Sequence, residues 1–280
     1  MNGILKLQLR RLLSSTGFYA ALFVSIAFVV VGFVETCVAF WGADVSDLPH
    51  AASAWGFNME EMRVQSLRVY VYFAMSILAA FPMCGLIARD IKSNTVPCIV
   101  VRGGAKAYIL SNATLAFLSA FFIVLITGVV SQLLAILVFP LHGDLAVNIN
   151  LPLYRTGYDP YIFLDSMRMS YPFMRNVVFI VYMSLWSGLM GLISYGLTFW
   201  NKGNLLSSLC APAIASLSLW YVIPALFQHD YVLVHFAYLF PSYQSLPFSM
   251  VVFVAIPLSM LAVSVLLIVV PIVTKREVFL

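Results

Sequence analysis

The sequence predicts an all-α membrane protein with six transmembrane helices, an N-terminal amphipathic interfacial helix, and short outer re-entrant helices before the last span. Hydrophobic residues make up 62% of the 280 residues and charged residues only 9%, whereas a soluble domain carries about 25% charged residues. The long apolar stretches are continuous rather than alternating, which favours helices over barrel strands. We therefore expect one membrane domain over residues 1–280, without a separate soluble domain.

Six stretches are long enough to cross a bilayer, for which about 20 apolar residues are needed. They cover residues 17–41, 67–88, 108–139, 174–200, 205–227 and 248–273. Small residues in the fourth stretch permit close helix packing, either within the chain or at a dimer seam. These small residues are Ser187, Gly188, Gly191 and Gly196.

Residues 1–16 are expected to form a helix in the membrane interface before the first span. Apolar and basic side chains fall on different faces when residues 4–13 are placed on a helix. One face holds Leu5, Leu9, Leu12 and Leu13, and another holds Lys6 and Arg10. The alternative is a plain extension of the first span that anchors it by positive charge.

The distribution of charge predicts the orientation in the cell membrane. Most of the 15 lysines and arginines fall on one side of the six spans, and most of the 11 acids fall on the other. Because basic loops stay in the cytoplasm, both termini are expected there. The basic side comprises Lys6, Arg10, Arg11, Arg89, Lys92, Arg102, Lys106, Lys202, Lys275 and Arg276. The net charge of +4 therefore reflects topology and gives no reason to expect a nucleic-acid partner.

Residues 228–247 are aromatic and apolar but too short to span, and Pro241 and Pro247 interrupt them. Such a segment is typical of a re-entrant hairpin, here on the outer side. Four of its residues are candidates for a gate: Tyr238, Phe240, Pro241 and Tyr243.

Glu35, near the outer end of the first span, is a candidate pathway residue because acids inside membranes are costly. The alternative places Glu35 in the water interface, where its charge needs no special role.

No catalytic, cofactor or metal site is expected in this chain. His229, Asp230 and His235 have a spacing that fits neither i,i+3 nor i,i+4 ligation on a helix. The segment 103–106 reads Gly-Gly-Ala-Lys, but it lacks the spacing of a phosphate-binding loop and follows no strand. The chain is therefore not expected to hydrolyse ATP by itself.

The inner loop 89–107 carries the strongest functional signal. It consists of a charged start, a small polar turn, a short apolar helix and a basic turn that leads into the third span. In these features it resembles the permease subunits of ABC-2 type ABC transporters. The residues that carry the resemblance are Asp90, Asn94-Thr95, Arg102, Lys106 and Tyr108-Ile109-Leu110-Ser111. Asn94 and Asn112 stand where that family has glycine and lysine.

The resemblance implies that the short helix couples the chain to a separate P-loop ATPase, which would hold ATP and Mg. It also implies a paired permease, the same chain or a related one. The expected coupling residues are Arg89, Asp90, Thr95, Val96, Pro97, Ile99, Val100, Arg102 and Lys106. A docking face made of Val96, Ile99, Val100 and Val101 fits this role, while Arg89, Asp90 and Arg102 fix its orientation. The alternative is an ordinary loop with anchoring basic residues.

The function expected from these features is ATP-driven export of an amphipathic or hydrophobic substrate, such as a peptide, a lipid-like molecule or a drug. Ionisable residues are scarce in the spans, which disfavours ions as cargo. A different class of function stays open: a membrane interaction or immunity protein without transport activity. Such a protein would bind a peptide through its aromatic outer loops, of which the longer covers residues 140–173.

Overall fold

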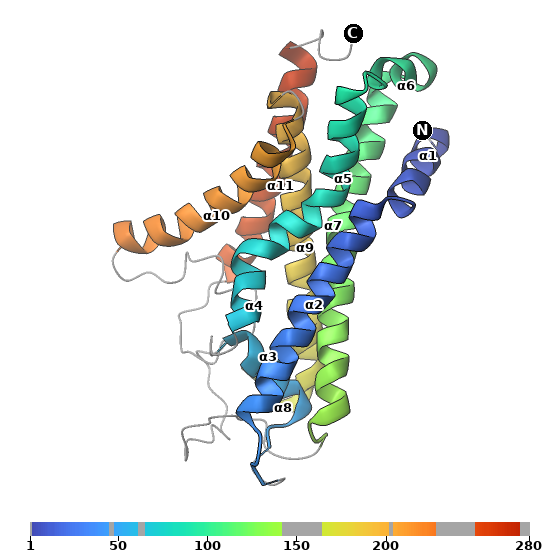
Figure 1. Cartoon of the computed structure of the whole chain (residues 1–280). Coiled ribbons are helices and arrows are strands. Elements are labelled where there is room, and N and C mark those ends of the chain that lie inside the picture. Colours follow the sequence, from blue (N-terminus) through green and yellow to red (C-terminus); the bar gives the residue numbers. More distant parts are fainter. Residues whose placement is uncertain are drawn as a thin grey trace.

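The computed structural model of the chain describes residues 2–44, 48–60, 65–141, 164–201, 204–227 and 250–274. Every regular element in these ranges is a helix, which confirms the predicted all-α class (Figure 1). In chain order the elements are α1 (Asn2–Leu13), α2 (Thr16–Ala39), α3 (Ala51–Glu60), α4 (Gln65–Val69), the π-helix η2 (Tyr70–Ala74), α5 (Met75–Lys92), α6 (Val96–Gly103), α7 (Ala105–Val138), α8 (Asp165–Ser170), α9 (Pro172–Trp200), α10 (Leu205–Phe227) and α11 (Met250–Thr274).

Among the described residues, four helices are long and apolar enough to cross a membrane, which supports a membrane protein. They are Thr16–Ala39, Ala105–Val138, Pro172–Trp200 and Phe253–Pro271. The predicted span 67–88 is instead divided into α4, η2 and α5. Pro82 lies inside α5 and cannot donate to the helical ladder, and the ribbon changes direction between α4 and α5 (Figure 1). The predicted span 205–227 has the same bounds as α10.

Helices α7 and α9 form the central pair of the bundle. In its most apolar window, α9 is 67% buried, compared with 22% for α2 and 11% for α11. Close approach depends on glycine: a Cβ at Gly191 would lie 2.8 Å from the backbone oxygen of Ala116 on α7. A Cβ at Gly196 would lie 2.8 Å from the Cβ of Leu267 on α11. These small residues therefore serve packing within the chain.

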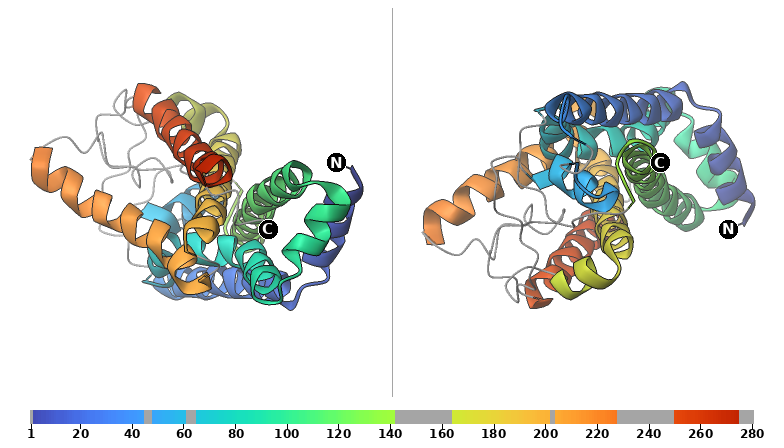
Figure 2. Two further views of the ribbon diagram at one scale, coloured as in Figure 1. Left: turned by 90° about the horizontal axis from the view of Figure 1, so that it is seen from above. Right: turned by 90° about the horizontal axis from the view of Figure 1, so that it is seen from below.

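Helix α11 packs along one side of α9 and leaves most of its apolar surface exposed. The hydroxyl of Tyr182 donates to the backbone oxygen of Phe253 at 3.0 Å, and the two rings are stacked. The indole N–H of Trp200 donates to the backbone oxygen of Leu267, also at 3.0 Å. Helix α10 extends away from the bundle, as both views in Figure 2 show. In a membrane protein, such exposed apolar surface is what lipid covers.

Helix α1, helix α6 and the last turn of α11 lie at one end of the bundle, and α3 and α8 lie at the other (Figure 1). The leucines on the predicted apolar face of α1 differ in burial. Leu12 is buried together with Gln8, whereas Leu9 and Leu13 are 40% and 47% exposed. The difference arises because a polar contact of Arg11 with α5, described below, sets the rotation of α1. Leu9 and Leu13 thus join Lys6 on the outward surface of α1.

We expect Gly191→Ala to destabilise the α7–α9 pair by about 1–3 kcal/mol, the usual cost of overpacking. The added Cβ meets the Ala116 carbonyl, a backbone atom that cannot move aside alone. Gly85→Ala is the matched control, because a Cβ at helical Gly85 meets nothing within 4 Å. Thermal unfolding of the purified variants in detergent measures both. Equal melting temperatures for the two variants would contradict the proposed close contact.

Candidate functional site

Asp90 is a buried acid at the end of α5, and its carboxylate is paired with Arg11 of α1. Its exposed fraction is 3%. Arg11 binds it in a bidentate manner, with Nη2 2.6 Å from Oδ1 and Nη1 3.0 Å from Oδ2. The same Nη1 lies 3.1 Å from Oε1 of Gln8. The hydrogen bond to Asp90 raises the pKa of Arg11 above its ordinary value. Bidentate, charge-assisted contacts of this kind are strong and directional, so they hold α1 in one rotation.

Two further hydroxyl groups reach the same carboxylate. The hydroxyl of Tyr108 on α7 donates to Oδ2 of Asp90 at 3.3 Å. The hydroxyl of Thr95 lies 3.3 Å from Oδ1, and the Thr95 backbone N–H donates to the Asp90 backbone oxygen at 3.0 Å. We call Gln8, Arg11, Asp90, Thr95 and Tyr108 the Asp90 cluster. It joins α1, the end of α5, the start of α6 and the start of α7 around one charge.

The turn between α5 and α6 is fixed by its backbone conformation. Asn94 has a φ of +54°, in the left-handed region that asparagine tolerates better than most residues. Ser93 donates from its hydroxyl to the backbone oxygen of Arg89 at 2.8 Å. Pro97 lies in the first turn of α6, where a missing N–H costs nothing. Gly104, with φ +82°, ends α6 and leads directly into α7. The left-handed conformation of Asn94 therefore allows the chain to turn sharply from α5 into α6.

Helix α6 has an inner face, which packs on α7, and an outer face, which is exposed. This division corrects the predicted docking surface. Val96 is buried, and Ile99 and Val100 pack beside it against Tyr108 and Ile109 of α7. These three apolar residues attach α6 to the bundle. On the outer face, Val101 is 86% exposed and Cys98 is exposed as well. Of the four residues expected to face a partner, Val101 is the one that projects.

The remaining predicted site residues lie in different places. Arg89 and Lys106 are exposed near α6, and Arg102 belongs to α6 with a side chain outside the described part. Glu35 lies on α2 and accepts a hydrogen bond from the Ser66 hydroxyl at 2.8 Å, at the start of α4. The predicted hairpin 228–247, with its gate residues, lies outside the described residues. The residues of that gate are Tyr238, Phe240, Pro241 and Tyr243.

A second polar contact, between α7 and α9 near the opposite end, was not predicted. The amide nitrogen of Asn176 donates to Gln132 Oε1 at 2.7 Å and to the backbone oxygen of Ala52 at 2.9 Å. Neighbouring Arg175 is buried, with its guanidinium 5.6 Å from the centre of the Phe179 ring. These polar residues interrupt apolar sequence, which is the signal that identifies them in membrane helices. They connect α3, α7 and α9.

The described residues contain no group of three or more side chains arranged to hold a metal ion. The fold and the site define a helical membrane protein that presents a short, rigidly held helix at one end of its bundle. Comparison with protein-family models, with curated proteins and with solved structures finds no match.

We expect Arg11 and Asp90 to be energetically coupled. Arg11→Gln leaves the buried Asp90 carboxylate without its cation and should destabilise the fold by about 1.5–3 kcal/mol, as for hydrogen bonds to charged groups. In the Arg11→Gln, Asp90→Asn double variant, the second substitution should cost much less than it does alone. A double-mutant cycle on detergent-solubilised protein measures the coupling.

Arg10→Gln is the matched control for this cycle, because Arg10 is its exposed neighbour on α1. It should change the free energy of unfolding by less than about 0.5 kcal/mol. Strictly additive effects of the Arg11 and Asp90 substitutions would contradict the proposed role of the ion pair.

Proposed function

We propose that the chain is the membrane-spanning permease subunit of an ATP-driven ABC transporter of the ABC-2 type, acting as an exporter. The observation that carries this proposal is α6, a separate helix held between α5 and α7 by the Asp90 cluster. A subunit that receives movement from a separate ATPase needs a compact element that does not yield under load. Helix α6 meets this need because its start, its inner face and its end are each fixed.

The outer face of α6 has the properties of a protein contact. Val101 projects as an apolar side chain, and the exposed cations nearby are Arg89, Lys92 and Lys106. An apolar centre with a charged rim is a common arrangement at protein interfaces. The basic rim favours a partner whose groove is acidic and steers its approach. In the resembled family, this partner is a P-loop ATPase that carries ATP and Mg.

In the proposed topology the chain has six spans in the cell membrane and both termini in the cytoplasm. The four apolar helices are completed by the α4–η2–α5 segment and by α10. The basic residues at the α1 and α6 end support its cytoplasmic location. Residues 228–247 complete the proposal as a re-entrant hairpin at the exit, with Glu35 on the same outer side.

The proposed transporter works as a pair of permeases, of one chain or two, because two ATPases close together on a paired bundle. Its cargo is amphipathic or hydrophobic. Charged side chains are scarce in the predicted spans, which disfavours ions as cargo.

Cysteine labelling tests the orientation. In a chain that keeps only the exposed Cys98, an impermeant thiol reagent should label nothing on intact cells and should label Cys98 after lysis. In a chain without native cysteines, Ala43→Cys at the opposite end should be labelled on intact cells, because Ala43 is exposed. The reverse pattern would overturn the orientation and, with it, the proposed contact with a cytoplasmic ATPase.

Substitution on α6 tests coupling. The full chain, purified in mild detergent, should bring down a P-loop ATPase that mass spectrometry identifies. Val101→Asp should weaken this association about tenfold or more, because a charge is placed in an apolar contact. Val101→Thr is the matched control of similar shape without charge, and it should retain most of the binding. Substrate-stimulated ATP turnover provides the second readout.

The choice of Val101 separates docking from folding. Val100→Asp would also disturb the packing of α6 on α7, so its effects would have two causes. Val101→Asp should leave the melting temperature of the chain unchanged, since its side chain is 86% exposed. Association and ATP turnover at wild-type levels in this variant would show that α6 is not the coupling element. Such a result would favour the interaction-protein function.

A further inference from the structure

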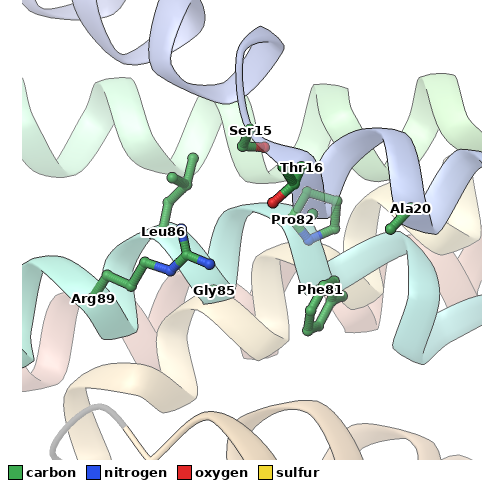
Figure 3. A pocket seen from close by; sticks show the side chains of 9 residues that line it. Ser15, Thr16, Ala20, Phe81, Pro82, Gly85, Leu86 and Arg89 are labelled. Carbon is green, nitrogen blue, oxygen red and sulfur yellow. The ribbon is translucent and has the colours of Figure 1, made fainter.

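A groove runs between the first turn of α2 and the last half of α5. Its volume is about 230 Å³. One side is formed by Thr16 and Gly17 at the start of α2, and the other by α5 from Phe81 to Arg89. Figure 3 shows the guanidinium of Arg89 and the hydroxyl of Thr16 directed toward the same space, with Pro82 beside Thr16. This groove is separate from the Asp90 cluster and from Val101, and it shares Arg89 with the basic rim beside α6.

Two glycines shape the groove in different ways. A Cβ at Gly17 would lie 3.3 Å from the Phe81 ring, so the missing side chain lets α2 approach α5 and close one end. A Cβ at Gly85 would meet nothing within 4 Å, so the missing side chain leaves the middle open. A long side chain at position 85 would fill the space.

The groove has an apolar floor and a cationic rim. Phe81, Pro82 and Leu86 supply the floor. At the rim, neither Arg89 nor Thr16 makes a side-chain hydrogen bond or ion pair with any residue that the structure describes. In the first turn of α2 the Phe18 N–H donates to Ser15, while the N–H groups of Thr16 and Gly17 lack acceptors within the helix and add partial positive charge at the same place. The cavity therefore suits a molecule with a negative head and an apolar tail.

We propose that this groove binds an anionic phospholipid, with its phosphate at Arg89 and one acyl chain along Phe81 and Pro82. The depth in the membrane supports this occupant: the groove lies where α2 begins its apolar run and where α5 reaches its charged end. The volume is below the 300–1,000 Å³ typical of a site that encloses a drug-sized ligand. The groove therefore fits a segment of one acyl chain, while the rest of the lipid stays in the bilayer. Basic residues at a membrane surface attract anionic lipid in this way.

The inference does not depend on transport, and its test uses the full chain without any ATPase. The purified protein is equilibrated with equal amounts of phosphatidylglycerol and phosphatidylcholine, and the retained lipid is counted by native mass spectrometry. Wild type should retain one phosphatidylglycerol in preference. Arg89→Gln should reduce that preference about fivefold, the effect of one cation at a lipid surface.

Lys92→Gln is the matched control for charge, since Lys92 is exposed one turn further along α5 and does not line the groove. It should leave the preference within twofold of wild type. Equal losses for Arg89→Gln and Lys92→Gln would show diffuse attraction to the surface and would overturn the site.

Substitutions at Gly85 that fill the groove test whether an acyl chain occupies it. Gly85→Leu should abolish retention of both lipids, whereas Gly85→Ala, which adds one methyl group in open space, should preserve most of it. Retention unchanged in Gly85→Leu would overturn the proposal. If Gly85→Leu lowers the melting temperature, the surface variant Arg89→Gln still decides the outcome.

Excess glycerol phosphate, which has the chemistry of the lipid headgroup without an acyl chain, should not displace the lipid. Displacement would show an anion site and would also overturn the proposal.

Discussion

The structure at one end of the bundle depends on the burial of a single charge. The Asp90 carboxylate is 3% exposed, and an unpaired buried charge costs several kcal/mol. Arg11, Thr95 and Tyr108 meet this requirement from three different segments. Because each donor must reach the same two oxygens, the rotation of α1, the start of α6 and the start of α7 are settled together. The neighbouring apolar side chains then pack around helices whose positions the contacts with Asp90 have already restricted.

The middle of the bundle is governed by a different constraint, the distance between backbones. Hydrophobic attraction between helices is weak in lipid, so packing relies on close contact. Gly191 brings α9 against the Ala116 carbonyl of α7, and Gly196 brings it against Leu267 of α11. Helix α9 is therefore in contact on two sides, while α11 keeps an apolar outer surface. This asymmetry explains why α9 is far more buried than α11, although both helices are apolar enough to cross a membrane.

The sequence predicted the helices well because length and apolarity are local properties. The predicted spans 174–200 and 205–227 agree within two residues with α9 and α10. The division of 67–88 was missed because continuous apolarity does not distinguish an α-helix from the π-turn of η2. Val96 was expected on the docking face of α6 because apolarity does not reveal which side of a short helix is buried. Its contacts with α7 decide that Val96 faces the bundle.

The last turn of α5 is where the proposed lipid contact and the Asp90 cluster meet. Arg89 and Asp90 are adjacent, and successive helical residues point about 100° apart. One therefore faces the groove beside α2 while the other faces α1 and α7. A lipid phosphate held by Arg89 would fix the end of α5 relative to the membrane surface, and Asp90 would fix α6 relative to that same end. Under both proposals, the lipid and the Asp90 cluster hold the end of α5 and α6 together. A force on α6 is then passed to the membrane spans instead of bending the loop.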